Sequence, residues 1–435
     1  MKLDFEKLNE KISNADCKRT LGRITKIVGL MLEAQGLHVE LGELCLIRSN
    51  NATIEAEVVG FKDDQALLMP LAEIHEIKMG AEVTPTKEQV HVRVGPNLVG
   101  RIINALGVPL DEGFELRLHH QVNQWQKTIN PLKKSRITDK IHFGVKALDG
   151  MLSCGKGQRL GIFAGSGVGK STLMGMLARN SSADINVIAL VGERGREVRE
   201  FIEECLGEEG LKKSIVIVAT GNEPSLVRIK AAIFAHSIAE YFRDVMGKDV
   251  LLMLDSVTRV ALAQREIGLA VGEPPATRGF TPSVFALLPK LLERSGTSDK
   301  GSITALYTVL VEGDDMNEPV SDLVRGVLDG HIVLSRDLAH KNHYPAIDIL
   351  QSVSRVMPSI VDKEHMQAAG QIRSFMATYK DAQDLINIGA YQKGSNPDID
   401  KAIKAYPKIN SLLRQATEED VSEEETLRLM KAALS

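Results

Sequence analysis

The spacing of apolar residues changes along the chain and divides it into regions. Between residues 19 and 90 the apolar residues fall in short runs, such as 53–59 and 65–70. Polar pairs separate these runs, for example Asn50-Asn51 and Asp63-Asp64. Short runs broken by turn residues are typical of the strands of a small β-barrel. We therefore expect a β-barrel domain at residues 19–90.

Apolar runs alternate with helical patterns from residue 159 to about residue 345. The expected strands are mostly continuous apolar runs, at Arg159–Phe163, Asn186–Val191, Ile215–Ala219, Val250–Leu254, Ile303–Val309 and His331–Leu334. Strands of a parallel sheet that is buried on both faces have this character. The expected helices lie between them, at Ser171–Arg179, Val198–Leu206, Ser225–Met246 and Ser283–Glu293. This alternation predicts an α/β, doubly wound core, which we assign to residues 91–358.

The chain becomes helical and polar after residue 360. Helices are expected near Glu364–Lys380, Ile399–Gln415 and Glu423–Ala433. This pattern predicts a C-terminal helical domain at residues 359–435. Before the core, residues 95–113 form a connector punctuated by glycine, and residues 118–140 look irregular.

Residues 1–18 form a short charged segment with one apolar stripe. Phe5, Leu8 and Ile12 recur at helical spacing within it. Such a stripe packs either on its own domain or on a partner protein. We treat this segment as a separate region.

Composition excludes several classes of protein. The 435 residues are 43% hydrophobic with a net charge of only −4, and 4% are aromatic. A balance of this kind gives no drive towards nucleic acid and no base-stacking platform. The sequence has no apolar run of 18 residues, and its first residues are too charged for a signal peptide. We therefore expect a cytoplasmic protein whose contact with membranes is peripheral only.

Cysteine and histidine give no sign of metal or nucleophilic chemistry. The four cysteines show no Cys-x-x-Cys spacing, and the histidines do not cluster. The sequence has no Gly-x-Ser-x-Gly elbow of the kind that carries a nucleophilic serine. Reduced, structural thiols are expected.

One stretch, Arg159-Leu-Gly-Ile-Phe-Ala-Gly-Ser-Gly-Val-Gly-Lys-Ser-Thr172, predicts a phosphate cradle. A buried strand leads into a loop of small residues, and a helix begins at Lys170. The loop amides and the helix dipole face anionic oxygens; the residues concerned are Gly165, Ser166, Gly167, Val168, Gly169 and Thr172. Lys170 would reach the β- and γ-phosphates, and the Ser171 hydroxyl would ligate Mg²⁺. Ala164 stands where the strict pattern has glycine, which is tolerated unless a positive φ is required.

Two carboxylates follow apolar strands downstream of this loop. Asp255 ends one strand, where P-loop proteins hold Mg²⁺ and its water, although apolar strands also end in aspartate without that role. Glu193 follows another strand, so it should lie at the same edge and could activate a water for in-line attack. Arg194 could pair with Glu193 or with phosphate. The alternative is a surface ion pair between Glu193 and Arg194.

Longer motifs resemble one family. Residues 191–198, Val-Gly-Glu-Arg-Gly-Arg-Glu-Val, resemble the catalytic-glutamate motif of rotary ATP synthase β subunits and their relatives. Residues 273–294 look like a signature of the same superfamily. The Pro-Pro-Ala-Thr within it, with residues 307–315 and 329–336, is most similar to flagellar export ATPases, and the injectisome ATPases of type III secretion come second. The resemblance covers the chain from about residue 20 onward.

The resemblance implies a ring-shaped homohexamer with sites for ATP and Mg²⁺ between subunits. It also implies a β-barrel, a P-loop, RecA-like core and a helical C-terminal domain. By resemblance, Lys170 and Ser171 bind phosphate and Mg²⁺, Glu193 activates water, and Asp255 is associated with Mg²⁺.

Three further roles come from the resemblance alone. Arg259 matches an arginine near the site, and Tyr344 matches a tyrosine that stacks on adenine. Arg355 matches an arginine finger that is given to the neighbouring subunit's site. From the residues alone, the alternatives are a core tyrosine before a proline turn for Tyr344 and a surface ion pair for Arg355.

The function implied is an ATP hydrolase that energises type III export of flagellar proteins. Implied partners are a stalk-like coiled coil at Asp314–Pro319, which otherwise reads as a polar turn, and a stator-like regulator at residues 1–18. The export gate, export substrates and chaperones are also implied, at the inner membrane face of the export apparatus. The alternatives are an injectisome ATPase, a noncatalytic ring subunit, a rotary ATP synthase subunit and a Rho-like RNA translocase. Glu193 argues against the noncatalytic subunit, and the low aromatic content argues against the RNA translocase.

Overall fold

The computed structural model describes residues 21–49, 52–73, 77–125, 129–130, 132, 134–311, 313 and 315–435. The chain forms two compact units. One comprises the chain up to Val90 together with Ala270–Glu273, and the other comprises His91–Leu269 and Pro274–Ser435. Residues 1–18 and Asp314, for which partner contacts are expected, lie outside the described residues. Among the described residues, no helix is both long and apolar enough to span a bilayer.

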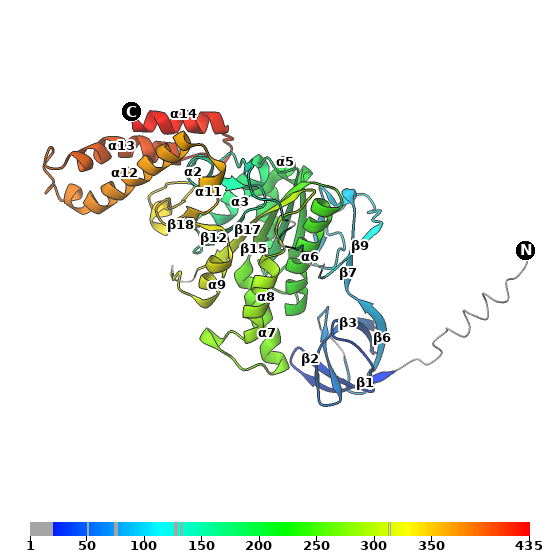
Figure 1. The fold of residues 1–435 in the computed structure, drawn as a ribbon. Helices are drawn as coiled ribbons and strands as arrows, with labels where there is room; N and C mark the ends of the chain where they lie inside the picture. Colours follow the sequence, from blue (N-terminus) through cyan, green and yellow to red (C-terminus); the bar gives the residue numbers. More distant parts are fainter. Residues whose placement is uncertain are drawn as a thin grey trace, which may run out of the picture. The chain divides into compact units, whose positions relative to one another are not determined.

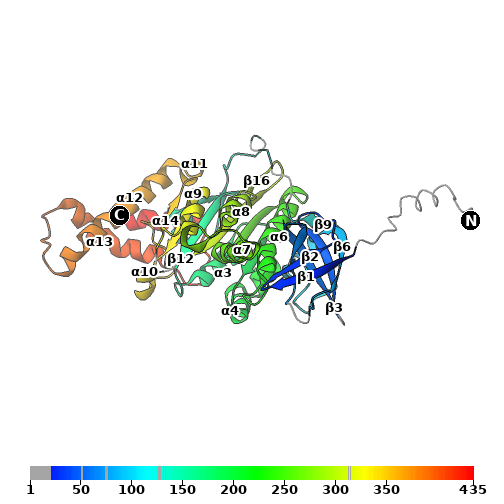
Figure 2. The same ribbon diagram turned by 90° about the horizontal axis from the view of Figure 1, so that it is seen from below.

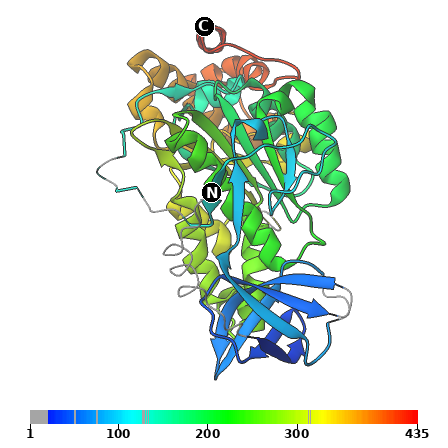
Figure 3. The same ribbon diagram turned by 90° about the vertical axis from the view of Figure 1, so that its right-hand side faces the viewer.

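The first unit contains a closed antiparallel β-barrel (Figure 3, blue). Its strands run in the order β1-β2-β5-β4-β3-β6, and their bounds are β1 Gly22–Val28, β2 Met31–Gln35, β3 Glu43–Ser49, β4 Ala52–Lys62, β5 Gln65–Pro70 and β6 Glu82–Gln89. Side chains alternate along β3, where Cys45 and Ile47 are buried and Arg48 is exposed. A period of two places one side of each strand in the barrel interior. The predicted barrel is confirmed.

A nine-stranded sheet forms the centre of the second unit (Figure 1). The strand order is β19-β18-β12-β17-β15-β13-β14-β8, and β16 pairs with β17. The bounds are β8 Ile102–Asn104, β12 Arg159–Ala164, β13 Ile185–Val191, β14 Ser214–Ala219, β15 Asp249–Asp255, β16 Gly296–Thr297, β17 Ser302–Leu310, β18 Gly330–Leu334 and β19 Val353–Ser354. Neighbouring strands from β18 to β8 are parallel. Every strand predicted for the core is present, and the doubly wound core is confirmed.

Helices flank this sheet (Figure 2). They are α2 Lys146–Met151, α3 Lys170–Asn180, α4 Gly195–Glu200, α5 Gly207–Lys212, α6 Ser225–Asp244, α7 Val257–Val271, α8 Pro282–Leu292, α9 Pro319–Val327, α10 Arg336–His340 and α11 Met357–Ile360. The short helical turn η1 Pro96–Leu98 precedes α2, and η4 Thr277–Gly279 lies between α7 and α8. Helix α6 packs across β13, β14, β15 and β17, and α3 packs against α5.

Three helices follow at the C-terminus: α12 Lys363–Asn387, α13 Pro397–Leu413 and α14 Glu423–Leu434. Each begins at a side-chain cap, in which Asp362, Asn396 or Ser422 accepts a main-chain N–H. These helices pack on α2 and share the core's apolar cluster, to which they contribute Ile372, Ile409 and Met430. The predicted helical C-terminus is confirmed.

The connector and the irregular segment contain more structure than their sequences indicate. Residues 95–113 include β8, which completes the sheet at one edge, where the N–H of Gly100 donates to the carbonyl of Ser214 at 2.8 Å. Residues 118–140 contain β9 His120–Asn123, which pairs with β7 His91–Val94, and they end at β10 Lys140–Ile141, which pairs with β11 Cys154–Gly155. The expectation of an irregular 118–140 was therefore wrong in part. Strands of two to four residues carry too little periodicity to be recognised without their partners.

The helix expected at Val198–Leu206 also differs. It is a composite of α4 and a π-helical segment, η3 Phe201–Leu206. A Cβ on Gly175 of α3 would lie 2.3 Å from the carbonyl oxygen of Cys205, so α3 and η3 approach each other closely at this glycine. Short π-helical segments such as η3 are frequent near functional sites.

Candidate active site

The loop between β12 and α3 has the geometry of an anion cradle. Gly167 and Gly169 have φ values of 77° and 88°, in the left-handed region that favours glycine. Ala164 is the last residue of β12 and pairs with Leu310 and Leu334 without a positive φ. A side chain at position 164 is therefore compatible with the fold, and Lys170 begins the helix immediately after Gly169.

Two neighbouring strands bring the carboxylates to this loop. Strands β13 and β15 pair in parallel, with Leu190 opposite Asp255, so Glu193 and Asp255 lie at the same sheet edge. Lys170 forms an ion pair with Asp255, and its Nζ lies 3.7 Å from Oε1 of Glu193. The side chains of Lys170, Glu193 and Asp255 are 13%, 12% and 5% exposed. The structure thus brings these three predicted residues together in a largely desolvated cluster.

The environment of Glu193 alters its acidity. Burial raises the pKa of Glu193 to about 7, and the negative charge of Asp255 also raises this pKa, whereas Lys170 lowers it. A hydrogen bond to Glu197 favours the protonated form of Glu193 and lowers the pKa of Glu197. Asp255 accepts a hydrogen bond from Oγ1 of Thr308 at 2.6 Å. A carboxyl group with a pKa near neutrality is suited to general-base chemistry.

The two arginines predicted beside the site differ in placement. The side chain of Arg194 is 82% exposed and forms an ion pair with Glu197 at 3.3 Å, not with Glu193. Arg259 lies against Gly192, and its charge lowers the pKa of Glu193. Its Nε is buried and has no hydrogen-bond partner among the described residues. An unpaired buried guanidinium N–H at the edge of a phosphate cradle fits an anionic ligand.

Tyr344 lies over the cradle. A Cβ placed on Gly169 would be 3.4 Å from Cε1 of the Tyr344 ring. The residue is 40% exposed, so one part of the ring packs on the loop while another part faces solvent. The structure therefore places Tyr344 beside the loop with part of its surface open to solvent.

Arg355 lies elsewhere. It follows β19, in which Ser354 pairs with Gly330 at the start of β18. Because β18 and β12 are parallel, this position is at the N-terminal ends of the strands, whereas the phosphate loop is at their C-terminal ends. The Arg355 N–H donates to the carbonyl of Asp329 at 3.0 Å, and its Nη1 donates to the carbonyl of Leu328 at 3.2 Å. Arg355 and Lys170 are therefore not brought together within one chain.

A cavity of about 670 Å³ surrounds the cluster. Its lining includes the predicted residues Gly165, Ser166, Gly167, Gly169, Lys170, Ser171, Thr172, Glu193, Arg194, Asp255 and Arg259. Val168 of the same loop is buried. A volume of this size is typical of sites for small molecules such as nucleotides.

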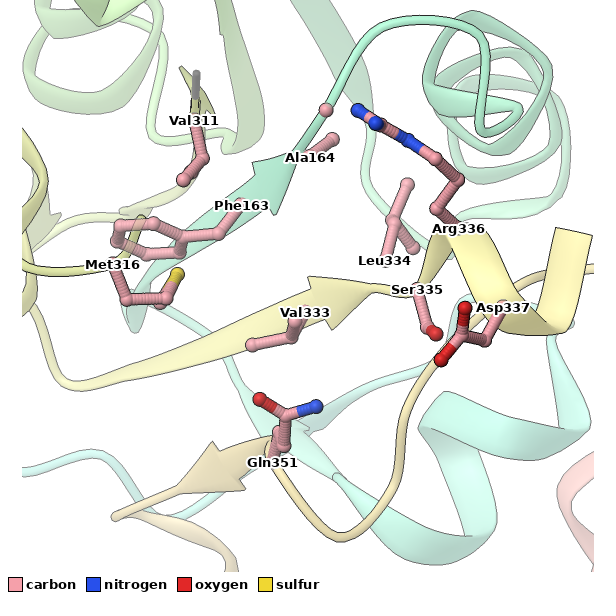
Figure 4. Close-up of a pocket in the computed structure, with 11 residues that line it drawn as sticks. Phe163, Ala164, Val311, Met316, Val333, Leu334, Ser335, Arg336, Asp337 and Gln351 are labelled. Atoms are coloured by element: carbon pink, nitrogen blue, oxygen red, sulfur yellow. The ribbon is translucent and has the colours of Figure 1, made fainter. Parts of the chain in front are cut away.

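Sequence reasoning missed Arg336 and Glu197, which also line this cavity. Arg336 follows β18, whose Leu334 pairs with Ala164 at the end of β12. Arg336 also lines a smaller hollow of about 180 Å³ (Figure 4), in which its guanidinium is turned towards the loop after Ala164. Phe163 and Met316 form part of the apolar wall of this hollow. The rule that identified Glu193 and Asp255, a charged residue just after a core strand, would also have identified Arg336.

Models of known protein families match three parts of the chain. The nucleotide-binding domain of the ATP synthase alpha/beta family matches residues 144–354, and the β-barrel domain of that family matches residues 24–87. The C-terminal domain of the T3SS EscN ATPase matches residues 361–432.

Curated relatives match over nearly the whole length. The flagellum-specific ATP synthase of Bacillus subtilis (strain 168) is 53% identical, and the alignment covers 97% of each chain. The chain belongs to the flagellar and type III secretion ATPase branch of the ATP synthase alpha/beta family. The type 3 secretion system ATPase of Xanthomonas euvesicatoria is 48% identical over 97% of this chain and 96% of that protein.

Solved structures of this ATPase branch share the fold. The assembled ATPase EscN from the type III secretion system of enteropathogenic E. coli superposes with a TM-score of 0.91 at 45% identity. The match covers 95% of this chain and 100% of that chain. EscN in complex with its central stalk EscO gives a TM-score of 0.88 at 44% identity.

The residues of this family member fit a nucleotide with its metal. The cradle, Lys170 and the buried Nε of Arg259 offer donors to phosphate oxygens. Among the described residues, no group of three or more His, Cys, Asp or Glu side chains could hold a metal by itself. Mg²⁺ keeps several waters and is usually bound by one or two protein oxygens together with substrate phosphates. Ser171 and Asp255, both in the lining of the cavity, suit that mode.

Proposed function

We propose that this chain hydrolyses Mg·ATP to energise type III export of flagellar proteins, with its sites between the subunits of a homohexameric ring. The observation that carries the proposal is the cluster of Lys170, Glu193 and Asp255 at the mouth of the cradle. A carboxylate with a pKa raised to about 7, placed just after a core strand and beside a phosphate loop, is suited to orient and deprotonate the attacking water. A noncatalytic nucleotide-binding subunit has no need of it.

In the proposed mechanism the loop amides and the N-terminus of α3 hold the phosphates. Lys170 exchanges its ion pair with Asp255 for the β- and γ-phosphates, which leaves Asp255 and the Ser171 hydroxyl to hold the metal. The Mg²⁺ ion, when bound, neutralises charge that develops on the transferred phosphoryl group. Glu193 orients the attacking water and accepts its proton. Arg259 donates to phosphate oxygens.

Adenine is proposed to stack on the exposed face of Tyr344. Arg355 is proposed to act in the site of a neighbouring subunit, because it lies at the sheet edge opposite its own phosphate loop. An arginine in trans stabilises transition-state charge. Activity would therefore depend on assembly of the ring.

The proposed partners follow from the relatives. EscN has been solved with its central stalk EscO, and a stalk-like coiled coil is proposed to contact the loop Asp314–Pro319 of this chain. In the described part of that loop, Asp315 and Glu318 form ion pairs with Arg278 at 2.8 and 3.4 Å. A stator-like regulator at residues 1–18, the export gate, export substrates and chaperones are further proposed partners. The proposed location is the cytoplasmic face of the inner membrane, at the export apparatus.

We assign domain limits within this proposal at residues 19–90, 91–358 and 359–435, after the docking segment 1–18. Helices α12–α14 share one compact unit with the sheet.

An injectisome role is the second candidate. It is favoured by the 48% identity to the type 3 secretion system ATPase of Xanthomonas euvesicatoria, although the flagellum-specific relative is more similar, at 53%. The two roles differ in the substrates exported, and the ATP chemistry is common to both.

Two measurements test the proposal. The purified full chain is expected to release phosphate from ATP with Mg²⁺ and to lose that activity with excess EDTA. A host strain that lacks the gene is expected to lose secretion of flagellar filament subunits and to regain it with the wild-type gene, but not with a Lys170→Ala gene. Absence of Mg²⁺-dependent hydrolysis would refute the enzymatic proposal. Normal filament secretion in the deletion strain would exclude the flagellar role and leave the injectisome role.

A further inference from the structure

One of the contacts between the α13–α14 segment and the unit that contains the central sheet is made by a buried side-chain amide, that of Gln415. Gln415 is 7% exposed, and every polar atom of its side chain is engaged. Its Oε1 accepts the N–H of Lys146 at 2.8 Å, and its Nε2 donates to the carbonyls of Gly144 at 2.6 Å and Glu419 at 3.0 Å. The side chain therefore fixes its own main chain against the start of α2.

The main chain of Gln415 in turn holds Tyr344. The Gln415 N–H donates to the carbonyl of Tyr344 at 3.0 Å. On the other side of this tyrosine, Nδ1 of His343 is hydrogen-bonded to Oδ1 of Asn410 at 2.8 Å. The aromatic ring that lies over Gly169 is thus set in place by the C-terminal helices.

Only an amide fits the contacts at position 415. The site presents one N–H donor, from Lys146, and two carbonyl acceptors, from Gly144 and Glu419. Glutamine supplies one acceptor and two donors in a single planar group. A glutamate of the same shape would retain the acceptor but would turn a carboxylate oxygen towards two carbonyl oxygens.

The rest of this segment has separate anchors. Arg179, near the end of α3, donates from Nη2 to the carbonyl of Thr417 at 2.6 Å and from Nη1 to the carbonyl of Cys205. Asn180 donates from Nδ2 to the carbonyl of Glu419 at 3.2 Å. Loss of the Gln415 side-chain amide therefore frees the main chain at position 415, whose N–H holds the carbonyl of Tyr344, while Arg179 and Asn180 still hold Thr417 and Glu419.

We infer that Gln415 is a positioning residue for the nucleotide base: it holds Tyr344 over the phosphate loop so that a purine can stack there. This inference rests on the proposed function, since it requires a nucleotide at the loop and its base on Tyr344. Gln415 does not touch the phosphates or the attacking water. It therefore governs the KM for ATP and the preference for ATP over CTP, because a purine gains more than a pyrimidine from an aligned aromatic face. The turnover of bound ATP does not depend on it.

The test compares Gln415→Glu with Gln415→Ala in the full chain, with steady-state kinetics on ATP and on CTP. Each variant is expected to raise the KM for ATP about fivefold to tenfold, to reduce the ATP-to-CTP ratio of kcat/KM by a similar factor, and to change kcat by less than about twofold. Thr417→Ala is the matched control, because it removes an exposed side-chain bond to Glu418 in the same segment that shares no partner with Gln415; its KM is expected to match wild type. If the charged variant does not fold, Gln415→Met retains the length of the side chain without its donors and takes its place.

Two results would overturn the inference. One is a folded Gln415 variant whose KM and ATP-to-CTP ratio equal those of the wild type. The other is strict additivity in the double variant Gln415→Ala/Tyr344→Ala, since a residue that acts through Tyr344 must lose its effect when the ring is gone. Failure of the proposed function is distinguishable from both, because the wild-type chain would then show no saturable hydrolysis of ATP.

Discussion

The central sheet has two strand-end edges: the C-terminal ends of the strands carry the phosphate loop, and the N-terminal ends carry Arg355. The two edges differ in how much of a site one chain supplies there. At the edge that carries the phosphate loop, Asp255 is buried, Lys170 and Glu193 are partly buried, and the three charges lie close enough to influence one another. At the opposite edge, the hydrogen bonds of Arg355 to other described residues go to main-chain carbonyls, those of Leu328 and Asp329. A cationic side chain anchored in this way keeps its charge available for an anion outside the chain. Within one chain, the first edge gathers the groups proposed to bind and hydrolyse the nucleotide, whereas the second leaves a guanidinium that, in the proposed function, completes a neighbour's site.

The largest expected effect tests this difference between the edges. Arg355→Ala should lower kcat of the assembled ATPase by about 10³-fold, because an arginine finger in trans contributes about 10³–10⁵. The measurement is phosphate release, made at a protein concentration above which the specific activity of the wild type no longer rises. Arg428→Ala, which removes an exposed arginine that is paired with Glu425 on α14, is the control and should be silent.

Mixing two inactive chains sharpens the same comparison. The Arg355→Ala chain keeps Lys170 in its own site. The Lys170→Ala chain keeps Arg355, which can act in the site of a neighbouring subunit. A mixture of the two should recover a fraction of wild-type activity, because some interfaces then combine both intact residues. No recovery in rings shown to be mixed, by co-purification of chains that carry two different affinity tags, would refute the trans role.

At the loop edge, Glu193→Gln should lower kcat by at least about 10²-fold, since a positioned general base contributes about 10²–10⁴. ATP binding, measured by calorimetry, should persist because the substitution leaves the cradle intact. The matched control is Glu209→Gln, whose carboxylate is 81% exposed and pairs with Lys212. Wild-type turnover in Glu193→Gln would eliminate its role as the base.

The pH profile should report the same carboxylate. Because the pKa of Glu193 is raised to about 7, the charged form that accepts a proton is scarce below this pH. The value of kcat/KM, which reports the free enzyme, should therefore rise with pH through about 7 and level off above it, with a loss of about tenfold from the plateau by pH 6. Measurements of kcat/KM from pH 5.5 to 9 test this expectation. A profile that is flat across that range, or one that keeps the same rise in Glu193→Gln, would assign the titration elsewhere.

A smaller effect is expected at the aromatic platform. Tyr344→Ala should raise the KM for ATP roughly tenfold, whereas Tyr344→Phe should restore most of the affinity, because stacking requires the ring and not the hydroxyl. Initial rates over a range of ATP concentrations separate KM from kcat. Equal KM values for the alanine and phenylalanine variants would remove the stacking role.

The smallest effect is expected for Arg194, although it adjoins Glu193 in the sequence. Its side chain is 82% exposed and pairs with Glu197, so Arg194→Ala should change kcat/KM by less than about threefold. Arg259→Ala, which removes a guanidinium with a buried and unpaired Nε, should have a much larger effect. Equal losses for the two variants would show that Arg194 turns into the site when nucleotide binds.

Much of the fold follows from periodicity, and much of the site follows from where the strands end. The apolar runs of β12, β13 and β15 were recognisable because both faces of the sheet are buried. Parallel strands present their C-terminal ends at one edge, so Lys170, Glu193 and Asp255 could be grouped before their contacts were known. Strand β8, with three residues, could not be predicted because it acquires its conformation by pairing with β14.

The sequence by itself determined the barrel, the alternating core, the helical C-terminus and the chemical character of the phosphate loop, because each depends on local spacing and residue type. Only the tertiary structure decided which charged groups meet. It paired Lys170 with Asp255, turned Arg194 towards Glu197, brought Arg336 to the cavity and placed Arg355 at the far edge. It also joined Gln415 to Tyr344. Contacts of this kind depend on strand order and helix docking between distant segments, which periodicity does not encode.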